Sequence, residues 1–184
     1  MAIRTSTAFA NLQLGTSGIS INGSLSGALS YGVLMLYSGA QPTTADNAAT
    51  GTLLAVITLG GGAFTDGATT NGLLLGRSSV WTAAGRAIGM PTGATWSCVA
   101  GATGTIGWAR LRGNAYDPMT NDTSFIYPRM DFSVGVTSGD IQLSNVNTTG
   151  TGFNTTFVST NVYTGYQGVS GGTSLTVTGV NLTA

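Results

Sequence analysis

Three ionisable residue types are missing from this sequence: its 184 residues include no Lys, no Glu and no His. The six basic residues are all Arg, and the six acidic residues are all Asp. General acid–base catalysis near neutral pH relies mostly on His, or on Glu or Lys with a shifted pKa. A Ser or Cys nucleophile would also lack its usual base. The sequence therefore predicts a protein that is not an enzyme.

Cysteine is nearly absent, because Cys98 is the only one. An intrachain disulfide and a zinc site made of Cys and His are both excluded. A site of oxygen ligands remains open, since Asp117, Asn121 and Asp122 carry the carboxylate and amide oxygens that Ca²⁺ binds. Asp and Asn are equally typical of turns, and we favour that interpretation. We expect no metal and no cofactor.

Charge is scarce as well: 7 % of residues are charged, the net charge is zero and the mean hydropathy is +0.26. Proteins near zero net charge tend to associate, so we expect a homo-oligomer, for example a trimer, with much of its surface covered by partners. The few Arg residues form no basic cluster, and nucleic acid is not an expected partner. The sequence has no apolar run of about 18 residues and no signal peptide, so neither a membrane nor export is expected.

The residues that are abundant, Gly, Ser, Thr and Asn, favour strands and turns over helices. Short strands separated by Gly-rich turns predict an all-β fold, specifically a jelly-roll-like antiparallel β-sandwich with long loops. In the strand expected at 105–111, Ile106 and Trp108 should share one face. The other expected strands are 33–37, 52–59, 130–136, 141–143, 153–163 and 174–180, with weaker candidates at 73–75, 79–81 and 94–99.

One expected strand is half-buried by its alternation, with Met130, Phe132, Val134 and Val136 on the buried side. A turn at residues 138–140 should join it to the strand at 141–143 as an antiparallel hairpin.

The domain organisation follows from the placement of these strands. We expect an extended N-terminal arm at 1–31, where glycines interrupt any helical run, and a β-sandwich core at 32–162. Residues 163–184 should add a C-terminal strand extension to the same domain.

Aromatic and Arg residues divide into core and interface candidates. Trp96, Trp108 and Phe132 are expected in the core. A Pro- and Asn-containing loop at 114–128 should instead present rings to a partner, because buried aromatic and Arg residues carry much of the binding energy of interfaces. Arg110 and Arg112 lie on one face of an expected strand, where ion pairs with a partner are favoured over contacts with phosphate. The expected interface residues are Tyr116, Phe125, Tyr127, Arg110 and Arg112.

Several segments between residues 33 and 158 resemble, in order, those of small β-rich virion structural proteins of tailed phages and prophages. The departures are an N-terminus without the Ala-rich helical segment of that family, longer stretches at 76–100 and 113–128, and a chain that continues past Tyr163. The resembling segments are Tyr37-Ser-Gly-Ala-Gln-Pro42, Ala45-Asp46-Asn-Ala48, Thr50-Gly-Thr-Leu-Leu-Ala55, Gly104-Thr-Ile-Gly-Trp-Ala-Arg110, Phe132-Ser-Val-Gly-Val136 and Asp140-Ile-Gln-Leu-Ser144.

The resemblance implies a virion structural protein without enzymatic activity. We expect a capsid decoration or cement protein that binds the major capsid protein and copies of itself on the capsid exterior, after synthesis in the host cytoplasm. The alternative is a receptor-binding or carbohydrate-binding module of a phage tail or fibre, for which an exposed platform containing Trp81 or Tyr residues would be the distinguishing feature.

Overall fold

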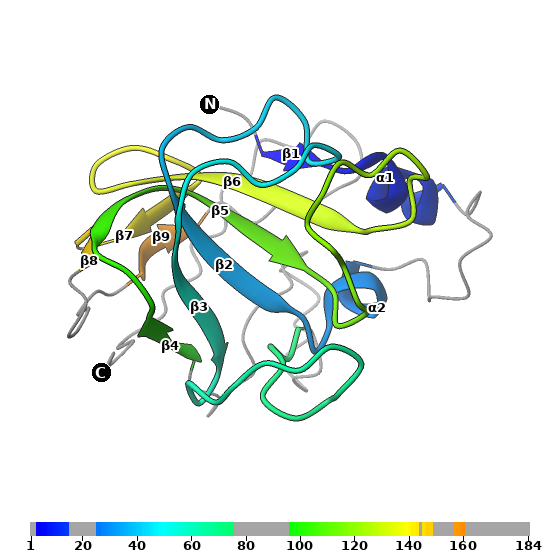
Figure 1. Ribbon diagram of the computed structural model, residues 1–184, viewed down its shortest axis with the longest axis horizontal. Helices are drawn as coiled ribbons and strands as arrows, with labels where there is room; N and C mark the ends of the chain where they lie inside the picture. Colours follow the sequence, from blue (N-terminus) through cyan, green and yellow to red (C-terminus); the bar gives the residue numbers. More distant parts are fainter. Residues whose placement is uncertain (1–2, 15–24, 76–95, 144, 149–156, 161–184) are drawn as a thin grey trace, which may run out of the picture.

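The computed structural model describes residues 3–14, 25–75, 96–143, 145–148 and 157–160 (Figure 1). Its principal strands form one sheet in the order β4-β3-β2-β5-β6-β7-β9, while β1 pairs with β6 and β8 pairs with β5. Every strand pair except one is antiparallel. The strands are β1 (Arg4–Thr5), β2 (Val33–Ser38), β3 (Leu53–Leu59), β4 (Trp96–Ala100), β5 (Gly104–Arg112), β6 (Arg129–Gly135), β7 (Ile141–Leu143), β8 (Asn147–Thr148) and β9 (Phe157–Thr160).

The fold is mostly antiparallel β-sheet with two short helices, which confirms the all-β prediction. Strands were correctly expected where β2 to β7 form. Of the weaker candidates, Leu73 makes only an isolated bridge with Gly32, and residues 79–81 lie outside the described part. The sheet is open, with β4 and β9 at its two ends. The two facing sheets of a jelly roll are not found among the described strands, so that finer prediction stays a prediction.

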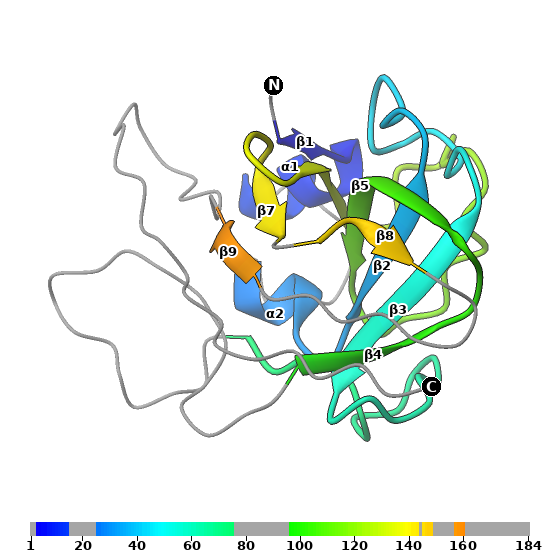
Figure 2. The ribbon, with the colours of Figure 1, turned by 90° about the vertical axis from the view of Figure 1, so that its left-hand side faces the viewer.

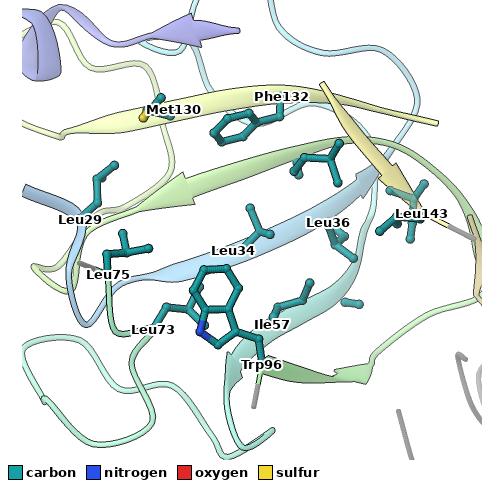
Figure 3. Packing of buried hydrophobic residues seen from close by; sticks show 14 of the residues in the cluster. Leu29, Leu34, Leu36, Ile57, Leu73, Leu75, Trp96, Met130, Phe132 and Leu143 are labelled. Atoms are coloured by element: carbon teal, nitrogen blue, oxygen red, sulfur yellow. The ribbon is translucent and has the colours of Figure 1, made fainter. Parts of the chain in front are cut away.

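One face of the sheet carries the apolar core (Figure 3). In the register of β2 against β5, Leu34 and Leu36 lie opposite Leu111 and Ala109. The helices α1 (Thr7–Gln13) and α2 (Leu25–Leu29) cover this face, as Figure 2 shows. The buried cluster also includes Phe9, Leu12, Leu29, Leu54, Ile57, Leu73, Leu75, Trp96, Ile106, Met130, Phe132, Ile141 and Leu143.

The N-terminal residues belong to this core, so the predicted extended arm is wrong for residues 4–14. Ser6 is the N-cap of α1, because its side chain accepts a hydrogen bond from the backbone amide of Phe9 over 3.1 Å. Phe9 and Leu12 are 1 % and 2 % exposed. Apolar residues on one side of a capped helix can bury that side, and this burial outweighs the low helix propensity of the surrounding sequence.

A β-bulge in β5 overturns the expectation that Ile106 and Trp108 share a face. The register against β2 shifts so that Tyr37 lies opposite Trp108 while Ser38 lies opposite Ile106. The extra residue is Gly107, where a Cβ atom would lie 2.0 Å from the Gly39 carbonyl oxygen. A bulge reverses the facing of the residues beyond it, so Ile106 enters the core cluster while Trp108 is buried on the opposite face.

The predicted hairpin between β6 and β7 is also wrong, because these two strands pair in parallel, with Val134 opposite Ile141. The short connection is held by Asp140, whose carboxylate accepts hydrogen bonds from the backbone amide and the hydroxyl of Ser133 over 2.9 and 2.7 Å. Val136, expected on the buried side, lies beyond the end of β6 and is 47 % exposed.

Candidate partner-binding surface

The second face of the sheet is polar and carries three of the six arginines. In the register of β5 against β6, Trp108, Arg110 and Arg112 lie opposite Ser133, Asp131 and Arg129. Loops at 39–52 and 113–128 cover this face of the sheet (Figure 2), and the first of them also reaches α1, because Asp46 bonds to Thr7. The side chains are therefore buried, and β6 is covered on both faces, which differs from the half-buried strand that its alternation predicts.

Arg110 and Asp131 form a fully buried bidentate ion pair. The guanidinium Nε and Nη2 each donate to one carboxylate oxygen over 2.7 Å, and both side chains are 0 % exposed. The remaining nitrogen, Nη1, donates to the Asn47 carbonyl over 3.0 Å. Burial raises the pKa of Asp131 above its usual range, against the lowering effect of the Arg110 hydrogen bonds. Arg110 therefore stabilises the ionised form of the Asp131 carboxylate.

Arg129 connects the two covering loops. Its Nε and Nη2 donate to the Asp117 carboxylate over 2.7 and 2.5 Å. Its Nη1 donates to the Thr120 carbonyl over 2.9 Å and lies 3.4 Å from the Ala45 carbonyl in the other loop. One guanidinium thus satisfies carbonyls from two segments that have no regular secondary structure.

Arg112 holds a third segment against the sheet. Its Nη1 donates to Asp66 over 2.7 Å and to the Ala115 carbonyl over 3.1 Å. The guanidinium carbon lies 4.8 Å from the centroid of the Phe64 ring, within the range of a cation–π contact.

An aromatic stack completes this face. The rings of Tyr37 and Trp108 lie 4.5 Å apart at an interplanar angle of 12°. The Trp108 indole donates to the Thr50 carbonyl over 3.2 Å, and the Arg110 guanidinium lies 5.4 Å from the centroid of the Trp108 ring system. Burial raises the pKa of the Tyr37 phenol to about 12.

The other three aspartates are also bonded within the chain. Asp46 accepts from the amide and hydroxyl of Thr7 over 2.8 and 2.7 Å, Asp122 accepts from the Tyr127 amide over 2.8 Å, and Asp140 is bonded to Ser133. Each of the six aspartates therefore has at least one intramolecular partner, and the Oδ1 atom of Asp122 is buried without one.

These bonds account for the residues that we considered for Ca²⁺. Both Asp117 oxygens bond to Arg129, and the Asn121 carbonyl oxygen accepts from the Ala48 amide over 2.8 Å. Within the described ranges, no group of three or more acidic or cysteine side chains is suited to hold a metal ion. The turn interpretation of these residues fits their hydrogen bonds.

Arg110 and Arg112 were wrongly assigned to an interface. They are 0 % and 7 % exposed and pair with Asp131 and Asp66 of the same chain, so their guanidinium groups are not available to a partner. Tyr127 is half-buried, with the Arg129 guanidinium 5.3 Å from its ring centroid. The bulge and the covering loops determine these positions, and neither is visible in the local sequence pattern.

Tyr116 and Phe125 lie where a partner could reach them, because their side chains are 67 % and 46 % exposed. Ile126, which the sequence analysis did not single out, is also 46 % exposed. We call these three residues the aromatic loop surface. Phe125 has a φ of 54°, a left-handed conformation that is unfavourable for an aromatic residue and is often found at functional sites.

The loop that carries this surface is held in place along its length. The Asp122 amide donates to the Asp46 carbonyl over 2.7 Å, and the Ala49 amide donates to the Met119 carbonyl over 3.3 Å. With the bonds of Asp117 and Asn121, these contacts fix the backbone between the exposed side chains. A fixed loop loses little conformational entropy when a partner binds.

Comparisons of the chain with models of protein families, with curated protein sequences and with solved structures give no match. Trp81, which would distinguish a carbohydrate-binding platform, lies outside the described residues. Among the helices of the described part, none has the length and apolar character needed to cross a lipid bilayer.

Proposed function

We propose that this chain is a structural protein of a tailed-phage virion, a capsid decoration or cement protein that binds the major capsid protein. The observation that carries the proposal is that the acidic side chains bond within the chain, while uncharged side chains are exposed. All six aspartates bond within the chain, and uncharged side chains, including two aromatic rings, are exposed on a fixed loop. Such a molecule acts through contact surfaces: its carboxylates are bonded within the chain, and Asp122 Oδ1, which has no partner, is buried.

The aromatic loop surface supplies the contact in this proposal. Interfaces derive much of their binding energy from a few aromatic residues that become desolvated. A decoration protein that binds only the assembled shell stabilises that shell by mass action. Self-association, for example as a trimer, would place several such surfaces on one oligomer and raise the avidity of its binding to the shell.

Counting the chain in purified particles tests the proposal. Particles of the phage or prophage that encodes this chain would be purified, and the chain and the major capsid protein would be quantified by mass spectrometry with labelled peptides. A decoration protein is expected at a copy number comparable to that of the capsid protein. Absence of the chain from the particles would overturn the proposal.

A few copies per particle, located by electron microscopy on the tail, would support the alternative, a receptor-binding or carbohydrate-binding module. The exposed Tyr116 ring favours this alternative, because exposed Tyr residues can form part of a sugar-binding platform. Binding of the protein to a glycan array, lost in Tyr116→Ser, would distinguish the two functions.

The jelly-roll-like sandwich remains part of the proposal. It requires a second sheet facing the open one, and the same particles, imaged at a resolution that traces the chain, would test for it.

A further inference from the structure

Among the strands that the structure describes, β4 lies at one end of the sheet and its outer edge has no partner. Strand β4 pairs with β3 in an uninterrupted antiparallel register, from Ala55 opposite Ala100 to Leu59 opposite Trp96. No other described strand pairs with it. Natural proteins protect such edges with Lys, Pro, inward charges or bulges. The sequence of β4, Trp-Ser-Cys-Val-Ala, has no charged residue and no proline, and its register shows no bulge.

The hydrogen-bonding direction of this edge follows from one bond. The Gly101 amide donates to the Leu54 carbonyl over 2.8 Å. Residues that exchange hydrogen bonds alternate along an antiparallel pair, so Val99 and Ser97 point their backbone groups toward β3. Trp96, Cys98 and Ala100 therefore point their amides and carbonyls outward. These groups form a template for one more strand.

The sequence contains a segment suited to this template. Residues 174–183 read Ser-Leu-Thr-Val-Thr-Gly-Val-Asn-Leu-Thr, in which Thr and Val are frequent and apolar residues alternate with polar ones on each side of Gly179. The stretch 141–184 contains no charged residue. A strand-forming segment without charges is prone to aggregation unless it is paired.

We infer that the outer edge of β4 receives residues 174–183 of a second copy by β-strand addition. The chain reaches β9, which ends at Thr160, at the opposite end of the strand order from β4. At about 3.3–3.6 Å per residue, residues 161–173 extend to about 45 Å, which is enough to reach a neighbouring molecule. A contact that joins one end of a molecule to a different edge of the next is head-to-tail, and it forms a ring where the rotation between neighbours closes and a filament where it does not.

This inference rests on the self-association part of the proposed function and identifies the contact that produces it. The test does not depend on where the chain lies in the virion, because it uses the purified full-length protein alone. If the contact fails and the chain is still found in virions, the proposed function stands and only this inference falls.

The test uses two complementary full-length variants. Ala100→Pro removes an outward amide of β4 and leaves its bonds to β3 in place, as proline at a strand edge does; it blocks the acceptor. Thr176→Pro/Val177→Pro blocks the donor, because one of two consecutive amides must face the acceptor strand. Ala100→Ser and Thr176→Ser/Val177→Thr are the matched controls that keep the amides.

Light scattering coupled to gel filtration gives the masses. The unmodified chain and both controls are expected as oligomers, and each proline variant as a monomer of 18.5 kDa with unchanged circular dichroism. Mixing the two proline variants restores one donor and one acceptor, so a dimer containing one copy of each is expected.

Three results would overturn the inference. Oligomers that persist in either proline variant would place the contact elsewhere. A monomeric unmodified chain that is destabilised by both proline changes would show that residues 174–183 pair with β4 of their own molecule. A mixture that stays monomeric, while both variants are folded, would show that the two sites do not meet.

Discussion

Arg110 and Asp131 face each other across neighbouring strands and join through two hydrogen bonds of 2.7 Å with no exposure to solvent. Removing one partner from a buried pair leaves an uncompensated charge, at a cost of about 3–5 kcal/mol. We therefore expect Arg110→Met to lower the free energy of unfolding by about that amount in urea denaturation.

The double variant Arg110→Met/Asp131→Leu is the control for this prediction, because it removes both charges and fills the space with apolar groups. It should recover most of the lost stability. A single variant as stable as the unmodified chain would contradict the burial of the pair.

Tyr37 predicts a loss of stability at alkaline pH. The unfolded chain loses the phenol proton near pH 10.0, whereas the folded chain keeps it to about pH 12. The folded state therefore binds more protons in this window, so the contribution of Tyr37 to stability is fully present below pH 10 and is lost as the pH rises toward 12. A shift of two units corresponds to about 3 kcal/mol. Urea denaturation at several pH values should show a shallower decline in Tyr37→Phe; equal slopes in the two proteins would refute the assignment.

Gly107 should not accept a side chain. A Cβ atom there would lie 2.0 Å from the Gly39 carbonyl oxygen, a backbone atom that cannot rotate away. Gly107→Ala is expected to cost at least about 1–3 kcal/mol in thermal or urea unfolding. Gly101→Ala is the matched control, since its nearest heavy atom would be 3.9 Å away. Similar stabilities for the two variants would argue against the bulge.

Ser6 connects the N-terminal helix to the sheet. Its hydroxyl accepts from the amides of Phe9 and Arg129 over 3.1 and 2.9 Å and donates to the Tyr127 carbonyl over 3.0 Å. Ser6→Ala leaves buried backbone groups without partners and should cost about 1–3 kcal/mol. Ser124→Ala, at an exposed position, should change the stability by less than about 0.5 kcal/mol. If the N-terminus were a freely extended arm, Ser6→Ala and Ser124→Ala would have the same small effect on stability.

Phe125 allows folding and binding to be separated. Its φ of 54° favours glycine, so Phe125→Gly should leave the unfolding free energy unchanged or higher. If the ring anchors a partner, the same change should weaken binding to purified capsids that lack the chain, by tenfold or more for a loss of about 1.4 kcal/mol. Met119→Gly, at a φ of 59°, gives the same backbone relief and keeps the ring. Equal capsid binding by both variants would exclude Phe125 from the interface.

The strands were predictable because their signal is local. Period-two alternation identifies β6 from Met130 and Phe132, and a short apolar run bounded by turn residues identifies β2. Helix α1 was also predictable from local sequence, but the many Ser, Thr and Gly residues around it favoured an extended interpretation. Ser6 is a good N-cap, and Phe9 and Leu12 are spaced to share one side of a helix.

The polar face was not predictable from local pattern. Arg110 pairs with Asp131 because of the register between two strands, and register depends on tertiary structure. The shift at Gly107 and the Asp140–Ser133 bonds, which hold the parallel β6–β7 connection, are likewise contacts between separate segments. For this reason the loop residues Tyr116 and Phe125 are exposed, as an interface requires, whereas Arg110 and Arg112 are buried.

The pairing of β1 with β6 has a consequence for synthesis on the ribosome. Arg4 lies opposite Asp131, so the first strand finds its neighbour only after most of the chain has been translated. Until then Phe9 and Leu12 have no completed core to enter. Contacts this distant in sequence slow folding, so residues that are made before the strands they pack against are among the last to reach their native positions.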